Sequence, residues 1–267
     1  MNRIGVFGAN GRMGQALLQA TYQDNNSEIA AAYVRKTSDF FGINVGPIIG
    51  VNDIEQTFCA LEQTNCANVD VLIDFTLPQG MLVHLAYAVA NQIPMVIGTT
   101  GLTAEEFAKL QQAAKTIPIV FSRNFSVGIN LLLNLVQTAA KTLSDEIDIE
   151  IFEAHHRHKI DAPSGTALAI GEAIAEAKGW DHNEVARYER HQDHVAKSQN
   201  EIGYSVLRAG DIVGEHTAYF ASIGERLEIT HKASSRMTFA QGAVRAAGWL
   251  KNKPAGLYDM QDVLGFK

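Results

Sequence analysis

Residues 8–14 are Gly8-Ala9-Asn10-Gly11-Arg12-Met13-Gly14, and this stretch decides the fold of the 267-residue chain. It follows an apolar run and precedes a helical pattern over Met13–Tyr22. Glycines in this context permit a tight turn, close approach of the backbone to a pyrophosphate, and close packing of helix on strand. The helix start adds free N–H groups and partial positive charge. The stretch therefore favours a dinucleotide site over an ordinary strand–turn–helix.

Apolar runs and helical patterns alternate on both sides of this loop. Strands are predicted at Arg3–Phe7, Ile29–Val34, Val69–Phe75, Pro94–Ile97 and Ile117–Phe121. Near-continuous apolar runs are typical of a parallel sheet that is covered on both faces. Helices are predicted at Met13–Tyr22, Pro78–Asn91 and Thr103–Lys115, the last with a capping-box pattern. The order predicts an α/β fold with a Rossmann-like, doubly wound parallel sheet.

The pattern changes near Ser126, where a second domain is expected. Residues 147–151 alternate strictly between isoleucine and acid, which indicates a half-buried strand. Further strands are predicted at Ile202–Leu207, His216–Ala221 and Arg226–His231, helices at Ile129–Leu143, Ser164–Lys178 and Phe239–Leu250, and a long exposed loop at Val185–Asn200. We expect a dinucleotide-binding domain at 1–126, completed by 237–267, and an α+β domain on a mixed sheet at 127–236. The crossings near Ser126 and Arg236 are the expected hinges.

Composition narrows the class of protein. Hydrophobic residues make up 46% and charged residues 19% of the chain, as is usual for a globular protein, and the formal net charge is -7. An acidic chain is a poor candidate for binding nucleic acid or an anionic membrane. The two cysteines, Cys59 and Cys66, have neither redox nor zinc spacing and indicate a reducing compartment. With no signal-peptide pattern at the start, a cytoplasmic protein is expected.

The end of the second predicted strand bears on the choice of cofactor. A site for NADH usually has an acid there that binds the ribose 2′-hydroxyl. This chain has Val34 followed by Arg35 and Lys36. We expect NADPH to be accepted at least as well as NADH, with Arg35 near the 2′-phosphate. A solvated surface pair is the alternative, and for Lys36 it is the preferred one.

Three polar segments follow consecutive predicted strands. They are Asp74–Thr76, Gly98–Gly101 and Ser122–Phe125. Ligands of an open parallel sheet bind outside the carboxyl ends of its strands, so these segments should meet at one edge. Each alone could be turn chemistry, but together they predict the floor of a cofactor site.

A basic stretch at Glu153–Lys159 follows the alternating strand. His155, His156, Arg157, His158 and Lys159 are consecutive, and like charges this close should lower the histidine pKa values. Such histidines suit general acid–base catalysis near neutral pH. A solvated basic turn and a metal site are the alternatives. We rank metal lower because His155 and His156 point to opposite faces of a strand and no HExxH spacing is present.

A capped helix start lies a few residues further on, at Asp161–Thr166. Ser164 or Thr166 can cap the helix, and Gly165 lets the backbone approach a ligand closely. A helix N-terminus of this kind binds carboxylates, although an ordinary N-cap would explain these residues as well. Its position beside the histidine stretch favours an anion site.

Together these motifs resemble the bacterial 4-hydroxy-tetrahydrodipicolinate reductase (dihydrodipicolinate reductase) family, of the diaminopimelate route to lysine. The resemblance covers essentially the whole chain, and its most specific part is EAHHRHKIDAPSGTA at 153–167. The other matching motifs are VFGANGRMG at 6–14, DFT at 74–76, IGTTG at 97–101, NFSVG at 124–128, RAGDIVGEHT at 208–217 and GERLEITHKASSRMTFA at 224–240.

The resemblance implies an NADH- or NADPH-dependent reduction of a cyclic, unsaturated dicarboxylate to tetrahydrodipicolinate, by a homotetramer associated through its substrate-domain sheets. It implies that His155 and Lys159 donate protons and that His156, Gly165 and Thr166 bind substrate. The implied cofactor contacts are Gly8, Ala9, Asn10, Gly11, Arg12, Met13, Gly98, Thr99, Thr100, Ser122, Arg123, Asn124 and Phe125. No metal is implied. The chain departs from the family at Val34, where relatives that use NADH well often have an acid.

Two readings from other classes remain open at this point. A non-catalytic dinucleotide sensor would need no acid–base residues, so the basic stretch at 155–159 counts against it. A metal-dependent hydrolase would use the histidines as ligands. A cofactor-oxidation assay separates the first from a reductase, and metal analysis of the purified protein tests the second.

Overall fold

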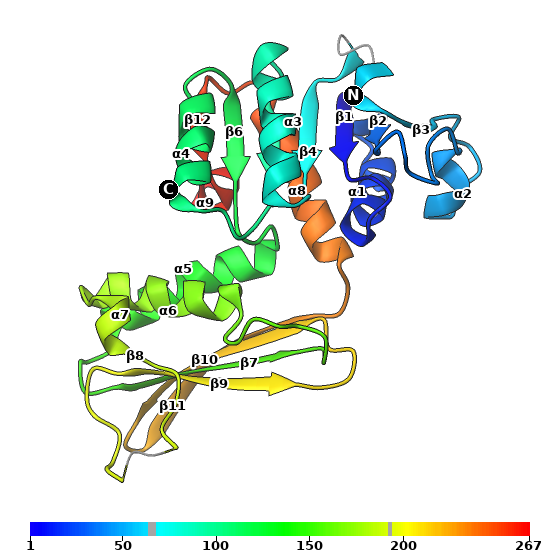
Figure 1. Cartoon of the computed structure of the whole chain (residues 1–267). Helices are drawn as coiled ribbons and strands as arrows, with labels where there is room; N and C mark the ends of the chain where they lie inside the picture. Colours follow the sequence, from blue (N-terminus) through cyan, green and yellow to red (C-terminus); the bar gives the residue numbers. More distant parts are fainter. Residues whose placement is uncertain (64–67, 192–193) are drawn as a thin grey trace. The chain divides into compact units, whose positions relative to one another are not determined.

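The computed structural model describes residues 1–63, 68–191 and 194–267 (Figure 1). Cys66 and residues 192–193 of the segment predicted as a loop lie outside the described residues. The chain splits into two compact units. The first comprises Met1–Val127 and Arg236–Lys267, and the second comprises Gly128–Ser235.

The first unit is built on a parallel sheet. Over the described residues its strands have the order β12-β6-β5-β4-β1-β2-β3, and every neighbouring pair is parallel. The strands are β1 (Asn2–Phe7), β2 (Ser27–Tyr33), β3 (Phe58–Cys59), β4 (Val71–Asp74), β5 (Met95–Ile97), β6 (Pro118–Phe121) and β12 (Gly256–Tyr258). The Rossmann-like sheet is confirmed. β3 and β12 were not predicted, because strands of two and three residues are too short to show a period.

Helices cover both faces of this sheet, and the alternation of side chains along each strand decides which face each residue joins. Val71 and Ile73 pack in one core cluster, and Leu72 between them packs in the other. The helices on the first face are α1 (Arg12–Gln23), α2 (Val45–Ile49), α8 (Met237–Leu250) and α9 (Met260–Leu264), and those on the second are α3 (Pro78–Ala90) and α4 (Ala104–Ala113). A short 3₁₀ turn, η1, spans Leu61–Gln63.

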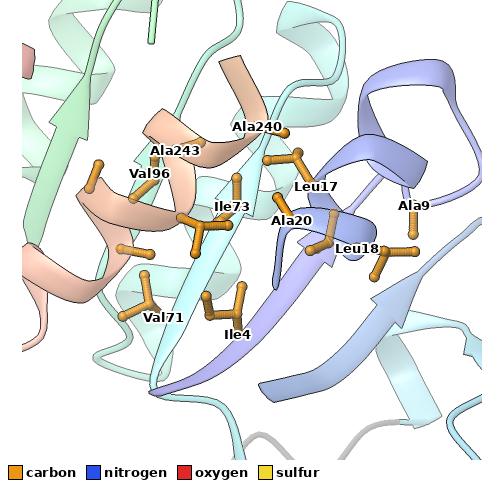
Figure 2. Packing of buried hydrophobic residues seen from close by; sticks show 14 of the residues in the cluster. Ile4, Ala9, Leu17, Leu18, Ala20, Val71, Ile73, Val96, Ala240 and Ala243 are labelled. Atoms are coloured by element: carbon orange, nitrogen blue, oxygen red, sulfur yellow. The ribbon is translucent and has the colours of Figure 1, made fainter. Parts of the chain in front are cut away.

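Figure 2 shows how the first face is filled. Leu17 of α1 and the small side chains of Ala240 and Ala243 on α8 meet Ile73 and Val96 of the sheet. Alanine at these positions lets α8 approach the strands closely. Burial of one large aliphatic side chain contributes about 1.5–3 kcal/mol, so this layer holds the C-terminal segment firmly to the N-terminal sheet.

The second unit has a mixed sheet, as the sequence analysis predicted. Its order is β11-β10-β7-β9-β8; β10 is antiparallel to β7 and β11, whereas β9 is parallel to β7 and β8. The strands are β7 (Asp148–His155), β8 (Ala186–Arg187), β9 (Ile202–Arg208), β10 (Gly214–Ser222) and β11 (Glu225–Ala233). Helices α5 (Val127–Thr142) and α6 (Gly165–Lys178) pack on one face around Ile149 and Ile151, and the short α7 spans His182–Val185.

One expectation about a connecting segment was wrong in part. The segment 185–200, expected as an exposed loop, contains β8, which pairs with β9. Arg190 and Lys197 of this segment are also tied to the sheet, because they donate to the carboxylate of Glu150 at 2.8 and 2.7 Å. The residues after Pro254, for which no element was predicted, form β12 and α9. None of the helices in the described part of the chain combines the length and apolar character that would span a membrane.

Candidate functional site

The glycine loop between β1 and α1 is shaped for a phosphate. Gly8 has φ +61°, and a side chain there would crowd Thr76. A Cβ at Gly14 would overlap the backbone of Gly8 and Ala9, so the loop and the helix start approach as closely as backbones can. Among the described residues no side chain caps α1. The first backbone N–H groups of α1 therefore remain available to a ligand at the helix N-terminus. This arrangement fits the pyrophosphate of a dinucleotide.

A pocket of about 870 Å³ lies against this loop and falls within the first unit. Four cations line it, namely Arg12, Arg35, Lys36 and Arg236, together with one acid, Glu62. Asn10 reaches across the pocket lining to Ser38, with Nδ2 donating to Oγ at 3.4 Å. The excess of positive charge suits a ligand with several phosphates. Arg35 and Lys36 both lie here, so neither is an isolated surface residue.

His84 lines the same pocket and is paired with a buried acid behind it. The Asp74 side chain is 0% exposed, and its Oδ2 lies 2.6 Å from Nδ1 of His84. Its Oδ1 accepts from the backbone N–H and the hydroxyl of Thr76, both at 2.7 Å. Since Asp74 pairs with Phe7 across the β1–β4 ladder, this carboxylate lies beside the glycine loop at the carboxyl edge of the sheet.

The predicted cofactor residues divide into two sets. The 870 Å³ pocket brings together Gly8, Asn10, Gly11, Arg12, Met13 and Arg35, while Ala9 is buried behind the loop. Gly98–Thr100 and Ser122–Phe125 do not line that pocket. They follow β5 and β6, where the N–H of Gly98 donates to Asp74 and that of Ser122 donates to Ile97. They therefore continue the same carboxyl edge away from the loop.

The residues of this second set are held by local contacts. A Cβ at Gly98 would collide with the ring of Phe75, and Thr99 is buried. The Ser122 hydroxyl donates to the carbonyl of Asn124 at 2.8 Å. Phe125 is buried in the core, with its ring centroid 5.2 Å from that of Phe75. The ring of Phe125 is therefore a packing group of the core and is not exposed to a ligand.

In the second unit, the carboxylate of Glu153 is the centre of a hydrogen-bond network. Its side chain is 1% exposed, and each of its oxygens accepts two hydrogen bonds. Oε2 accepts from Nδ1 of His155 at 2.6 Å and from Nη1 of Arg208 at 2.7 Å. Oε1 accepts from the backbone N–H of Ser164 at 2.9 Å and from Nη2 of Arg208 at 2.8 Å. One carboxylate thus joins the histidine to the start of α6.

The charge of Glu153 follows from these partners. Burial raises the pKa of the carboxyl, but hydrogen bonds from His155, Arg208 and Ser164 outweigh it and bring the pKa to about 2. Glu153 is therefore ionised at neutral pH and can only accept hydrogen bonds. The Nδ1 of His155 must then carry the proton that it shares with Glu153, so the exchangeable position of the ring is Nε2.

Two residues of β10 surround the His155 ring. The ring of His216 makes an edge contact with it at a centroid distance of 5.1 Å, and Nε2 of His216 lies 3.0 Å from the hydroxyl of Ser164. Burial, together with the nearby His155, lowers the pKa of His216 to about 3, so His216 is neutral. A Cβ at Gly214 would come within 3.1 Å of Nε2 of His155, so glycine there leaves that nitrogen room.

The basic stretch is not a cluster of unpaired cations. Mutual repulsion was expected among residues 155–159, but the structure places a carboxylate against two of them. His155 contacts Glu153, and Nζ of Lys159 lies 2.9 Å from Asp161. Lys159 also closes a turn onto His156, since its N–H donates to the His156 carbonyl at 3.1 Å. Glu153 and Asp161, which lie at either side of residues 155–159, therefore offset part of the positive charge of this stretch.

The start of α6 is capped by Ser164, whose hydroxyl accepts from the N–H of Ala167 at 3.2 Å. This confirms one of the two caps that the sequence allowed. Gly165 and Thr166 are the next two residues, and a Cβ at Gly165 would meet no atom within 4 Å. Contacts within the protein therefore do not require glycine at position 165. A ligand bound closely at the N-terminus of α6 would require it.

Several residues of these sites were missed from the sequence. Glu153 and His155 are two apart on a strand, so they had to share a face, and that spacing could have found the pair. His84 was a lone ionisable residue in an apolar helix, which was a usable indication. Arg208 and His216 carried no local pattern. Among the described residues, no group of three or more His, Cys, Asp or Glu side chains is arranged to hold a metal ion.

Comparisons with known proteins agree over the whole chain. The family model "Dihydrodipicolinate reductase, N-terminus" matches residues 2–125, and "Dihydrodipicolinate reductase, C-terminus" matches residues 128–264. A 4-hydroxy-tetrahydrodipicolinate reductase from Pseudoalteromonas translucida is 69% identical, over 100% of this chain and 99% of the relative. One from Pseudomonas fluorescens is 55% identical, over 99% of each.

A solved structure supports the fold. The dipicolinate-bound dihydrodipicolinate reductase of Paenisporosarcina sp. TG-14 matches with a TM-score of 0.76 at 23% identity, covering 98% of both chains. A probable dehydrogenase from Thermotoga maritima matches with a TM-score of 0.66 at 9% identity, covering 98% of this chain and 92% of that one. The glycine loop, the Glu153 network and the two family models together show that the chain belongs to the dihydrodipicolinate reductase family.

Proposed function

We propose that this protein reduces 4-hydroxy-tetrahydrodipicolinate to tetrahydrodipicolinate with NADPH or NADH, in the diaminopimelate route to lysine. The family and the names of the close relatives support the reaction. The observation that carries the proposal is the single carboxylate of Glu153, which binds both His155 and the N–H of Ser164 at the start of α6. An acid and an anion-binding helix start are thereby held together in one unit.

The dicarboxylate is bound by positive groups of the second unit in this proposal. The start of α6, at Gly165 and Thr166, receives one carboxylate through backbone N–H groups and the Thr166 hydroxyl. His156 and Lys159 add positive or hydrogen-bonding groups for the rest of the ring. The related enzyme from Paenisporosarcina, whose structure contains dipicolinate, binds a ligand with the same two carboxylates.

The bound reduced nicotinamide supplies a hydride. Loss of the 4-hydroxyl as water leaves a conjugated ring, and addition of a hydride to that ring leaves an electron-rich carbon that must take a proton. His155 gives this proton from Nε2, because its Nδ1 is held by Glu153. Lys159 is the second donor, and it returns a proton to His155 or to the product. A positioned acid of this kind accelerates a reaction by roughly 10²–10⁴.

The dinucleotide is held in the first unit. Gly8–Met13 would hold the pyrophosphate, and Arg35, with Lys36 next to it, would hold the 2′-phosphate of NADPH. Gly98–Thr100 and Ser122–Phe125, which follow β5 and β6, would hold the nicotinamide end. The absence of an acid at Val34 supports the use of NADPH at least as readily as NADH.

We further propose that the protein is a cytoplasmic homotetramer that associates through the sheet of the second unit. Helices α5 and α6 pack on one face of this sheet. Leu207 pairs with Ala154, on the face opposite to the side chains that pack under these helices, and it is apolar yet 42% exposed, as expected for a strand that meets a second copy. Light scattering gives the assembly directly, and a monomer at micromolar concentration would contradict it.

The test is a cofactor-oxidation assay with the dicarboxylate substrate, run in parallel with NADPH and NADH. His155→Ala should lower kcat by about 10²-fold or more, because it removes the acid. Thr166→Ala should mainly raise KM, because it removes a ground-state contact. An intact kcat in His155→Ala would refute the assignment. Absence of cofactor oxidation in the wild type would instead favour a dinucleotide sensor.

A further inference from the structure

We propose that Glu153 and Arg208 are positioning residues that fix the tautomer of His155, so that Nε2 always faces the substrate as the exchangeable nitrogen. The inference rests on the proposed function, in which His155 is the acid. It concerns two residues that touch neither substrate nor cofactor in that proposal. Their role would be exerted through the ring of His155.

The geometry makes Glu153 the natural orienting group. Glu153 and His155 lie on the same face of β7, and their side chains meet at 2.6 Å. An ionised carboxylate accepts but does not donate, so it selects the ring form that carries hydrogen on Nδ1. In the neutral ring Nε2 then has the free lone pair, and in the charged ring Nε2–H is the proton available for transfer.

Arg208 keeps the carboxylate ionised. Its two terminal nitrogens donate to the two oxygens of Glu153 at 2.7 and 2.8 Å, which is the bidentate arrangement. Without it, the buried Glu153 would keep only His155 and the N–H of Ser164, and desolvation would favour the protonated acid. A protonated Glu153 could donate to Nδ1 and force the opposite tautomer, with hydrogen fixed on Nε2 of a neutral ring.

Arg208 is itself held in place from three sides. Its guanidinium donates to the carbonyls of Lys159, Asp161 and Leu207 at 3.3, 2.5 and 2.8 Å. Among the described residues, the titratable groups around His155 and its neighbour His216 are Glu153 on β7, Arg208 on β9, His216 on β10, His231 on β11, and Lys159 with its partner Asp161 in the loop after β7. His216 is neutral, so Arg208 is the cation that directly bonds Glu153. The carboxylate of Glu153 therefore links the charge of Arg208 to the orientation of the His155 ring.

The test combines NMR of ¹⁵N-labelled histidines with kinetics. In the wild type, the neutral ring of His155, assigned by comparison with His155→Asn, should show hydrogen on Nδ1. In Glu153→Gln this preference should be lost and kcat should fall about 10²-fold or more, because an imidazole in the wrong tautomer is a poor catalyst. Glu150→Gln is the matched control, since Glu150 lies on the same strand and is paired with Arg190 and Lys197.

Arg208→Gln gives a second, independent readout. In the wild type the low pKa of Glu153 keeps its protonation out of the assayed pH range. In Arg208→Gln the pKa of Glu153 should rise, so a new acidic limb should appear in the pH profile of kcat. A merely structural role for Arg208 would lower stability without adding that limb.

The outcomes separate the two proposals. If His155→Ala loses activity but Glu153→Gln keeps both the Nδ1–H tautomer and a kcat within about 3-fold of the wild type, the positioning role is overturned and the proposed function stands. If His155→Ala stays active, the proposed function itself fails. Should Glu153→Gln not fold, Arg208→Gln carries the test, and an unchanged tautomer and an unchanged pH profile of kcat in that variant overturn the inference.

Discussion

The imidazole of His84 lies flat on the phenyl ring of Phe7, with ring centroids 3.8 Å apart and planes inclined by 3°. Phe7 in turn stacks on Tyr33, at 4.8 Å. The three rings come from α3, β1 and β2, and all line the pocket beside the glycine loop. Asp74, through its 2.6 Å contact with Nδ1, fixes the His84 end of this stack.

The stack predicts a large effect of removing Asp74. Asp74→Ala leaves the N–H and hydroxyl of Thr76 and the ring of His84 without their acceptor in a buried place. We expect the free energy of unfolding to fall by about 2–5 kcal/mol and NADPH binding to weaken. Urea unfolding and fluorescence titration measure the two effects. Asp53→Ala, which removes an exposed acceptor of Tyr22, is the control and should change stability by less than about 1 kcal/mol.

Cofactor choice should depend on Arg35. Arg35→Ala should lower kcat/KM for NADPH by about 10- to 100-fold and leave that for NADH nearly unchanged, because a hydrogen bond to a charged group contributes about 1.5–3 kcal/mol. Lys36→Ala is the comparison for a neighbouring cation of the same pocket and should have the smaller effect. An unchanged NADPH-to-NADH ratio in Arg35→Ala would remove Arg35 from the 2′-phosphate site.

Two glycines should respond to alanine in opposite ways. At Gly165 a Cβ meets open space, so Gly165→Ala should keep or raise stability, by up to about 1 kcal/mol, while KM for the dicarboxylate rises. At Gly14 a Cβ would overlap the loop backbone, so Gly14→Ala should destabilise the first unit and abolish dinucleotide binding. Thermal unfolding and steady-state kinetics on both variants separate the roles. An unaffected KM in Gly165→Ala would argue against a ligand at the start of α6.

Stability should fall with acidification because of His216. Its pKa of about 3 in the folded protein lies below the ordinary value of 6.5, so the unfolded chain binds a proton that the folded one rejects. This contribution is complete above about pH 6.5 and is lost as the pH falls towards 3. Urea unfolding between about pH 7 and pH 5 should therefore show a slope of up to ~1.4 kcal/mol per pH unit from this group.

The matching variant is His216→Gln, which keeps a polar side chain but does not titrate. Its stability should depend less on pH over the same range. His231 also has a pKa lowered by burial and remains in both proteins, so the difference between them isolates His216. Parallel pH profiles would show that His216 binds protons equally in the folded and unfolded states, so that burial does not lower its pKa.

The sequence predicted most of the scaffold for identifiable reasons. Apolar runs such as Val69–Phe75 are long enough to show that both faces are covered, and the alternation at 147–151 is a strict period of two. The two-residue β3 and three-residue β12 offer no period, and only the edges of the sheet define them. Thr103 was recognisable as a cap because its capping box, formed with Glu106, is local in sequence.

The site was predictable where its chemistry is local. His155 and Lys159 were predicted because both belong to one run of basic residues. Their acidic partners, Glu153 and Asp161, lie on either side of that run, and these ion pairs were not predicted. Arg208 is 55 residues from Glu153 in sequence, and the parallel β7–β9 pairing alone brings them together. His84 looked like part of an apolar helix until Asp74, ten residues earlier, was seen beside it.

The division of the first unit between the two ends of the chain also sets the order in which the protein can mature on the ribosome. Residues 128–235 emerge as one continuous piece and can close their core while synthesis is still in progress. The N-terminal strands must wait, because α8 covers one face and β12 completes an edge, and both belong to the final 32 residues, 236–267. A truncation within that tail leaves the apolar face around Ile73 and Val96 uncovered, so cellular quality control should remove such chains however intact their acid-bearing unit is.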